Sequence, residues 1–272
     1  MANVYFELTK EFNARGTIAL LAAGQAVVYY RIAMMSKDGD WVLRETREAC
    51  ARVLEVLGAR GARYRFGSPL DVRWLRGGWS SHLEFRDEEG RRVRCDFLTR
   101  PPRVGAAALD RLFAAGGDAG PLRVVDLDSL IRMKQTQRAK DYPVIAELAR
   151  LLLEDGELRY TTDPDRIIAL AARPGASCDR PAARIARAGG TREDVAVAVA
   201  RETLALQEED RRRVEAYEAA SAAFLAEFRR RGIAQMPLGE AHGALVDLAG
   251  SVLPADPLGM TGEGTRRDAD AR

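Results

Sequence analysis

Two aspartates separated by one glycine, Asp38-Gly39-Asp40, are the residues of this sequence best suited to chemistry. On a strand, side chains at positions i and i+2 point to the same face, so these carboxylates can share one divalent ion. A third carboxylate, Asp96, lies in the mostly apolar run 93–98, where an acidic side chain is costly unless it is paired or metal-bound. If the two strands are neighbours, the site suits Mg²⁺, which prefers carboxylate and phosphate oxygens, and phosphoryl transfer is the chemistry it predicts.

Each aspartate also has an ordinary structural interpretation. Asp-Gly is a strong two-residue hairpin signal, so the step from Asp38 to Gly39 could simply turn the chain. Asp96 could be an edge-strand carboxylate that pairs with Arg94 or Arg100. The prediction of a metal site therefore depends on the combination of the three carboxylates.

The elements that must position these aspartates alternate between helices and strands. The predicted order is a helix at residues 4–13, a strand at 17–22, a helix at 25–33, a strand at 40–43, a helix at 45–57, and a hairpin of strands 82–86 and 91–98 around the turn 87–90. The first amides of the helix at 25–33 would face a phosphate-sized opening at the end of the preceding strand. This order predicts an α+β (or α/β) fold with a mixed β-sheet and flanking helices.

The second half of the sequence is predicted to be helical. The helical segments are expected near residues 127–137, 142–154, 164–171, 192–231 and 238–248. We expect a first domain over residues 1–155, a helical C-terminal region over 156–250 and a disordered tail over 251–272.

Composition narrows the classes of function. The net charge of +2 predicts no strong global attraction to nucleic acid or to an anionic membrane. The sequence has no apolar run long enough to span a bilayer and no signal pattern at its start, so we expect a cytoplasmic protein without a membrane partner. Cys50, Cys95 and Cys178 lack the spacing of a disulfide framework or zinc site and are expected to be reduced thiols. His82 and His242 stand far apart in sequence, so carboxylates must carry any metal chemistry.

In their order along the chain, these segments resemble the DNA polymerase β-type nucleotidyltransferase superfamily, and most closely its AbiEii-like and minimal-nucleotidyltransferase branch. In that family a Gly-Gly or Gly-Ser pair closes the first strand, D-x-D opens the next strand, and a third Asp lies on a later one. Here Ala23-Gly24 occupies the place of the pair, Asp38 and Asp40 form the D-x-D, and Asp96 is the third carboxylate. The resemblance covers roughly residues 12–153.

A second motif extends the resemblance. AbiEii-like proteins carry a K-x5-KD segment, which matches Lys134 to Asp141 here and includes Arg138 and Lys140. From the residues alone, Lys134 continues the buried face of a helix, and it either extends past the core edge to water or reaches a nucleotide phosphate. Asp141 precedes a Tyr-Pro step and an apolar stripe, so it is also a candidate helix N-cap.

The resemblance implies a Mg²⁺-dependent nucleotidyltransferase that moves a nucleoside monophosphate from an NTP to an RNA or protein hydroxyl. It implies Asp38, Asp40 and Asp96 as catalytic metal ligands, in what could be a two-metal site, with Lys134 as a further catalytic residue. The nucleotide-binding residues that it implies are Gly24, Gln25, Lys37, Arg138, Lys140 and Asp141. Such proteins often act as toxins on tRNA or protein targets, each paired with a cognate antitoxin.

Two departures from the family pattern keep a second class of function open. Ala23 stands where the family has glycine, and Gly39 stands where it has an apolar residue. They motivate the alternative of a non-catalytic protein that binds a nucleotide or a partner protein. In a third alternative, the chain is an α/β domain with a helical extension, in which the Asp-Gly step is only a turn.

A local basic surface is also predicted, with a solvated and salt-bridged face as the alternative. Its members are arginines with tryptophans interleaved: Arg73, Arg76, Arg91, Arg92, Arg94, Arg100 and Arg103, with Trp74 and Trp79.

Overall fold

The computed structural model describes residues 3–114 and 120–259. The chain divides into two compact units, of which the first comprises the described residues up to Val125 and from Glu215 onward, and the second runs from Asp126 to Val214. This division differs from the expected boundary at residue 155. The difference arises because apolar residues after Glu215 join the core beneath the sheet, as Phe224, Phe228 and Leu245 do.

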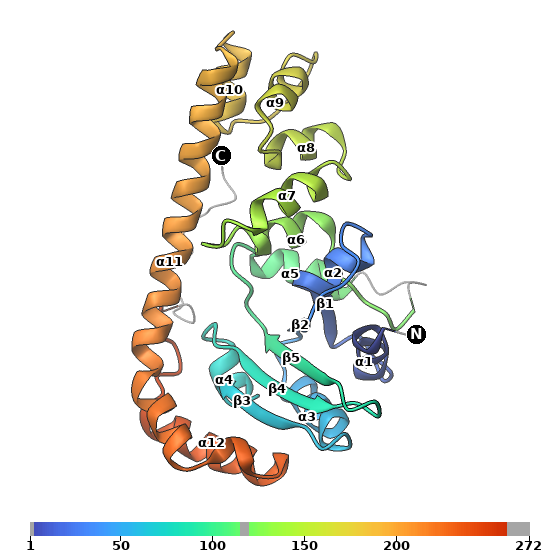
Figure 1. Cartoon of the computed structure of the whole chain (residues 1–272), viewed down its shortest axis with the longest axis vertical. Coiled ribbons are helices and arrows are strands. Elements are labelled where there is room, and N and C mark those ends of the chain that lie inside the picture. Colours follow the sequence, from blue (N-terminus) through green and yellow to red (C-terminus); the bar gives the residue numbers. More distant parts are fainter. Residues whose placement is uncertain (1–2, 115–119, 260–272) are drawn as a thin grey trace. The chain divides into compact units, whose positions relative to one another are not determined.

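A five-stranded mixed sheet with the strand order β1-β2-β5-β4-β3 forms the centre of the first unit (Figure 1). The strands are β1 (Ala19–Ala22), β2 (Asp38–Leu43), β3 (Arg63–Gly67), β4 (Ser81–Arg86) and β5 (Arg92–Leu98). β2 and β5 are parallel, whereas the other neighbouring pairs are antiparallel. This mixed sheet with flanking helices confirms the predicted α+β fold class.

The helices of the first unit lie around this sheet. They are α1 (Val4–Phe12), α2 (Ala23–Tyr29), α3 (Arg47–Gly58), α4 (Val72–Leu75), α5 (Ala106–Ala114), the 3-10 turn η1 (Ile233–Gln235) and α12 (Leu238–Val252), with the end of α11 (Arg192–Arg230). Side-chain caps set the starts of two of them: Asn3 accepts the Tyr5 amide at 3.0 Å, and Thr46 accepts the Ala49 amide at 3.2 Å.

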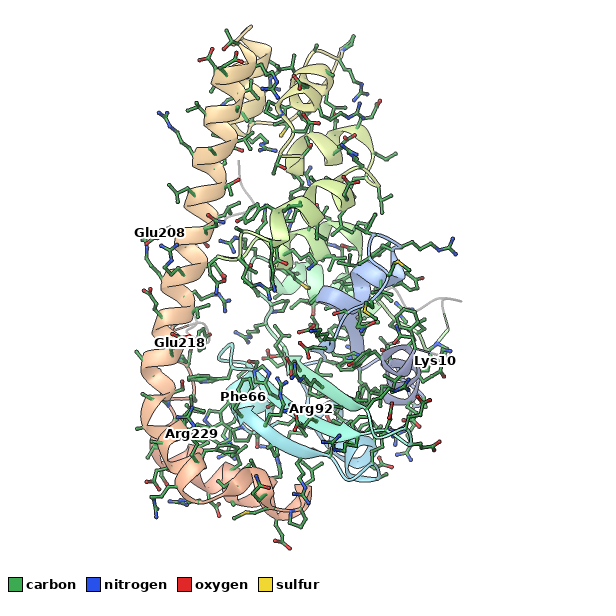
Figure 2. All side chains as sticks on the ribbon, viewed as in Figure 1. Lys10, Phe66, Arg92, Glu208, Glu218 and Arg229 are labelled. Atoms are coloured by element: carbon green, nitrogen blue, oxygen red, sulfur yellow. The ribbon has the colours of Figure 1, made fainter. Side chains whose placement is uncertain are left out.

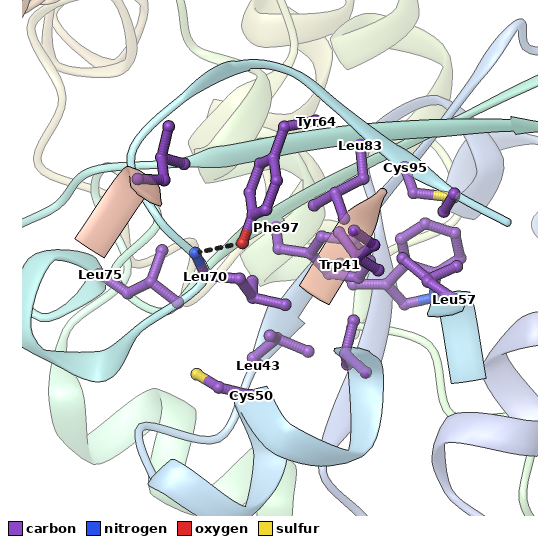
Figure 3. Packing of buried hydrophobic residues seen from close by; sticks show 14 of the residues in the cluster. Trp41, Leu43, Cys50, Leu57, Tyr64, Leu70, Leu75, Leu83, Cys95 and Phe97 are labelled. Atoms are coloured by element: carbon purple, nitrogen blue, oxygen red, sulfur yellow. Dashed lines mark hydrogen bonds between the residues drawn. The ribbon is translucent and has the colours of Figure 1, made fainter. Parts of the chain in front are cut away.

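The core lies on one face of the sheet because alternate residues of each strand point toward it (Figure 3). Trp41 on β2 stacks on Phe97 of β5 with ring centroids 5.3 Å apart. Phe12 of α1 meets both rings edge-on, and the Trp41 Nε1 donates to Thr9 Oγ1 at 2.8 Å. The one polar atom of this indole is thus satisfied within the core, where an unpaired donor would be costly.

The second unit is helical and has a core of its own. Its elements are α6 (Leu127–Lys134), α7 (Asp141–Ala149), α8 (Glu154–Tyr160), α9 (Pro164–Ala171), α10 (Pro181–Arg187) and the first part of α11. Leu158, Ile167 and Val195 are fully buried in that core. Beside them Arg180 pairs with Glu202 and also donates to the Thr161 carbonyl at 2.8 Å.

Several predicted elements are confirmed, and others were wrong or missed. The hairpin of β4 and β5 has the expected turn, in which Gly90 adopts a φ of 76°. The helix predicted at residues 25–33 begins at Ala23 and ends at Tyr29. Sequence reasoning missed β3, α4, α5, α8 and α10. These segments are short, with at most nine residues each.

The tail predicted to be disordered from residue 251 is ordered at its start. α12 continues to Val252, and Leu253 is buried. The Trp74 Nε1 donates to the Leu253 carbonyl at 3.3 Å, and the Trp79 Nε1 donates to the Pro254 carbonyl at 2.8 Å. Residues 260–272 of the predicted tail lie outside the described residues.

The same two tryptophans correct the predicted basic surface. Trp74 and Trp79 are buried, so neither is an exposed aromatic among the arginines.

In the described part of the chain, no helix combines the length and apolar character needed to cross a membrane. Cys50, Cys95 and Cys178 are free thiols, as predicted.

Candidate functional site

The register of β2 and β5 brings the three aspartates to one face of the sheet. Asp40 is directly opposite Asp96, and Asp38 is opposite Arg94. Partners in register share a face, and residues two apart on a strand do so as well. The alternative in which Asp38-Gly39 only turns the chain is therefore wrong, because both residues lie within β2.

Asp96 is held by two cationic or ionisable neighbours. Its Oδ1 lies 2.9 Å from His82 Nδ1 and 3.3 Å from an Arg65 terminal nitrogen. The other ring nitrogen of His82, Nε2, lies 2.9 Å from Ser80 Oγ. β5 lies between β2 and β4 rather than at an edge, so the edge-strand interpretation of Asp96 is wrong, as is its pairing with Arg94 or Arg100.

Sequence reasoning missed His82 and Arg65 at this site. Symmetric pairing about a turn at residues 87–90 would put His82 opposite Cys95. In the structure Arg86 pairs with Arg92 instead, and this shift of one residue puts His82 opposite Asp96. No sequence signal pointed to Arg65 either. It falls in a register irregularity between β3 and β4, and the strand that contains it was not predicted.

The two arginines predicted to pair with Asp96 pair with other carboxylates. Asp38 Oδ1 lies 3.2 Å from an Arg94 terminal nitrogen, and Arg100 pairs with Glu45 at 2.8 Å. Among residues 3–114 and 120–259, no three His, Cys, Asp or Glu side chains are arranged closely enough to hold a metal ion. The backbone thus aligns the three carboxylates, while Asp38 and Asp96 are directed at basic side chains.

The turn from β1 into α2 lies beside these strands, since Ala22 is opposite Asp40. Ala23 has a φ of 44°, a left-handed conformation that glycine adopts easily and alanine does not. A Cβ on Gly24 would lie 2.2 Å from Ser36 Oγ, so any larger residue at this position would have to displace Ser36. The small pair at residues 23–24 therefore fits the tight backbone of this turn.

Two predicted nucleotide-binding residues have structural contacts in this region. Gln25 is buried; its amide nitrogen donates to the Ser36 carbonyl at 2.9 Å, and its amide oxygen accepts from Asn3 at 3.0 Å. Lys37 is exposed, and its carbonyl accepts from Tyr5 Oη at 2.7 Å. Gln25 is thus engaged in holding the loop between α2 and β2.

Gly39 is explained by the opposite face of the sheet. An added Cβ would lie 2.4 Å from Tyr5 Cδ1 and 2.5 Å from an atom of the Trp41 ring. Burial, together with the nearby Cys95, raises the pKa of Tyr5 to about 12, so its hydroxyl remains a proton donor near neutral pH. The glycine between the two aspartates makes room for this aromatic packing.

Lys134, Arg138 and Asp141 form a separate cluster within the second unit. Lys134 is buried at the end of α6, with its Nζ 3.4 Å from Asp141 Oδ1. The other Asp141 oxygen accepts from Thr136 Oγ1 at 2.9 Å and from Arg138 Nε at 2.8 Å. Asp141 is the first residue of α7, so its carboxylate does not cap the helix. Lys134 therefore does not extend to bulk water, and Lys140 is exposed beside this cluster.

Comparisons with known proteins give a likeness to two solved structures. No protein family model matches the sequence, and no curated protein matches it. A candidate nucleotidyltransferase from H. pylori matches with a TM-score of 0.37 and 11% identity, over 77% of this chain and 96% of that one. JHP933 from Helicobacter pylori matches with a TM-score of 0.37 and 11% identity, over 79% of this chain and 94% of that one. At this level of similarity, the roles of individual residues depend on the geometry of the site itself.

Proposed function

We propose that this chain is a Mg²⁺-dependent nucleotidyltransferase that transfers a nucleoside monophosphate from an NTP to an acceptor hydroxyl. The observation that carries the proposal is the register of β2 and β5, which aligns Asp38, Asp40 and Asp96 on one sheet face. Carboxylates on adjacent strands can hold a divalent cation, which in turn stabilises the charge on a transferred phosphoryl group.

The donor chemistry fits a hard divalent cation, because carboxylate oxygens are the ligands that Mg²⁺ prefers. The backbone places Asp40 opposite Asp96. Asp38 and Asp96 would hold the metal after leaving Arg94 and Arg65. When bound, the metal would supply charge neutralisation at the transferring phosphate. In the reaction the acceptor oxygen bonds to the α-phosphorus, the bond from that phosphorus to pyrophosphate breaks, and Asp96 assists in removing the acceptor proton.

Label transfer tests the activity. Purified protein is incubated with each α-³²P-labelled NTP, Mg²⁺ and either total RNA or cell extract, beside an Asp38→Asn, Asp40→Asn double variant. Transfer by the wild type alone is expected, whereas equal labelling by the two proteins would refute the proposal. Glu88→Gln is the matched control, since Glu88 is an exposed carboxylate in the hairpin turn.

A readout separate from turnover tests the metal ligands. Mn²⁺ binding, followed by its electron paramagnetic resonance signal, is expected for the wild type and lost in the double variant. Circular dichroism of each variant shows whether the fold is retained. Wild-type affinity for Mn²⁺ in the folded double variant would exclude these aspartates as ligands.

The predicted nucleotide-binding residues of the second unit can be tested without disturbing its core. Lys140 is exposed, so Lys140→Ala removes a charge with little expected effect on stability. We propose that this variant has a weaker affinity for NTP, measured by isothermal titration calorimetry. Unchanged affinity would remove Lys140 from the nucleotide-binding set.

A second candidate function is a non-catalytic protein that binds nucleotide or a partner protein. The observation that favours it is the pairing of Asp38 with Arg94 and of Asp96 with Arg65, whose guanidinium groups offset both carboxylate charges without a metal. NTP binding without label transfer would support this candidate over the enzyme.

The most specific part of the proposed function is a role as a toxin. We propose that production of the wild-type chain in a bacterial host arrests growth and that the Asp38→Asn, Asp40→Asn variant does not. Equal growth of the two strains at matched protein levels would argue against a toxin while leaving the transferase activity open to the labelling assay.

A further inference from the structure

An arginine-lined groove of about 940 Å³ lies at β3, β4 and β5. Its lining includes six arginines against one glutamate, Glu84: Arg60, Arg63, Arg65, Arg86, Arg92 and Arg94. Arg65 and Arg94 are also the side chains that contact Asp96 and Asp38. The groove therefore adjoins the candidate site.

Four of the six arginines form ion pairs with carboxylates, and the other two, Arg63 and Arg86, offer their charge to a ligand. Arg63 and Arg86 are exposed, and neither has an ion-pair partner within the described ranges 3–114 and 120–259. Arg86 donates to the Gly90 carbonyl at 2.8 Å. Arginine without a carboxylate partner is well suited to phosphate, because its planar donors can bind two oxygens at once.

An apolar cavity continues from this groove. It measures about 510 Å³ and shares Arg65, Phe66, Ala234 and Gln235 with the groove. Leu225 and Phe228 line it as well. Figure 2 shows Phe66 and Arg92 over the same part of the sheet, away from Lys10 on α1.

Phe66 is the exposed aromatic of this surface. Its relative exposure is 45%, although phenylalanine is normally buried. The His82 ring supports it from the sheet, with centroids 4.2 Å apart and planes 26° from parallel. An aromatic ring held in this way beside a phosphate-binding groove offers a stacking surface to a nucleobase.

We infer that the groove binds a single-stranded nucleic acid, with phosphates on the arginines and a base against Phe66 in the adjoining cavity. This inference rests on the proposed function for its consequence, which is that the strand supplies the acceptor hydroxyl. A duplex keeps its bases stacked inside, and the acidic side chains of a peptide carry no flat ring for the Phe66 cavity. A single strand uses both the charge and the aromatic surface.

Fluorescence anisotropy with the full chain tests binding in EDTA and without NTP. The labelled probes are a mixed-sequence single-stranded RNA, the same sequence as single-stranded DNA, a blunt RNA duplex and a polyglutamate peptide. Both single strands are expected to bind more tightly than duplex and peptide, and the ratio between RNA and DNA identifies the natural source. Peptide binding as tight as strand binding would overturn the inference.

The Arg63→Ala, Arg86→Ala double variant tests the groove. We expect about tenfold weaker binding, and a slope of log affinity against log salt that is shallower by about 1.4, because two phosphate contacts are lost. The matched control is Arg47→Ala with Arg111→Ala, which also removes two exposed positive charges, neither of which lines the groove. Equal losses in the two double variants would show a nonspecific charge effect and refute the groove.

Phe66 substitutions separate stacking from charge. Phe66→Ala is expected to weaken strand binding by about 5- to 100-fold with an unchanged salt slope, and Phe66→Tyr is expected to retain affinity. Equal affinity of Phe66→Ala and the wild type would show that no base stacks on Phe66 in the cavity. Thermal unfolding of each variant checks that the fold is retained.

The transfer assay distinguishes failure of this inference from failure of the proposed function. In the Arg63→Ala, Arg86→Ala variant we expect a higher KM for RNA with unchanged kcat. Strand binding without transfer by the wild type would overturn the transferase and leave the groove standing. Transfer to protein alone, with no strand binding, would overturn the groove inference and leave the transferase standing.

Discussion

The two faces of the same sheet differ in what their residues do. On one face Trp41, Leu83 and Phe97 are fully buried against the surrounding helices. On the other, Asp40 and Asp96 face each other across β2 and β5, one residue away from those aromatics along the same strands. Strand alternation thus lets a rigid apolar core position polar groups that need not stabilise the fold themselves.

The largest effect on stability is expected from the apolar face. Trp41→Ala removes a fully buried indole that packs on Phe97 and Phe12. We expect the free energy of unfolding to fall by about 3–5 kcal/mol, measured by chemical denaturation. Trp41→Phe should lose less, and a loss below about 1 kcal/mol for the alanine variant would contradict the assignment of this face as the core.

Gly39 tests how closely the two faces are coupled. Gly39→Ala would bring a Cβ within 2.4 Å of Tyr5 and 2.5 Å of Trp41, so the aromatic packing must shift. We expect a loss of about 1–3 kcal/mol by the same denaturation measurement. Gly105→Ala is the control, because no heavy atom lies within 4 Å of its added Cβ. Equal stability of the two variants would show that the core yields more easily than its packing suggests.

Replacing Ala23 with glycine, in the turn beside the aspartates, is expected to stabilise the fold. Ala23 adopts a φ of 44°, which costs an L-residue energy that glycine does not incur. Ala23→Gly should raise the free energy of unfolding by about 0.5–1 kcal/mol after the entropy of the unfolded chain is included. Ala107→Gly, on an exposed position of α5, should lower it by a similar amount. A loss in the first variant would contradict the strained turn.

The polar face should contribute little to stability. Asp38 and Arg94 form an ion pair whose side chains are 39% and 34% exposed. Asp38→Asn should change the free energy of unfolding by less than about 1 kcal/mol, and added salt should reduce the difference. A larger loss would mean that the carboxylate stabilises the sheet rather than serving the site.

The weakest expected effect is a pH dependence on the core side of the sheet. His242 packs beside Tyr64, with its Nδ1 2.8 Å from Tyr64 Oη. Burial there lowers the pKa of His242 below its ordinary value of 6.5. Below that value the unfolded chain binds a proton that the folded chain resists. The contribution to stability is therefore present above pH 6.5 and is lost as the pH falls.

Denaturation at about pH 7.5 and about pH 5.5 measures this dependence. The wild type should lose more stability between the two values than His242→Gln does. Identical losses would show that His242 is as easily protonated in the folded chain as in the unfolded one.

Much of the fold followed from local patterns. The hairpin of β4 and β5 could be predicted because its strands are adjacent in sequence and alternate around a glycine-containing turn. β3 (Arg63–Gly67) could not be predicted in this way, because the strand is short and carries two arginines. Its place in the sheet depends on pairing with β4, a contact that local pattern does not encode.

The α+β class and the shared strand face of Asp38 and Asp40 follow from the sequence alone, because both depend on backbone periodicity. The sequence did not determine the setting of the carboxylates. Only the tertiary structure placed His82 and Arg65 against Asp96, and Arg94 against Asp38. These contacts join residues from different strands, and their geometry depends on the sheet order and on a local irregularity in β3. The same pairing assembled the arginine groove, whose members are scattered along the chain and are adjacent only in the folded sheet.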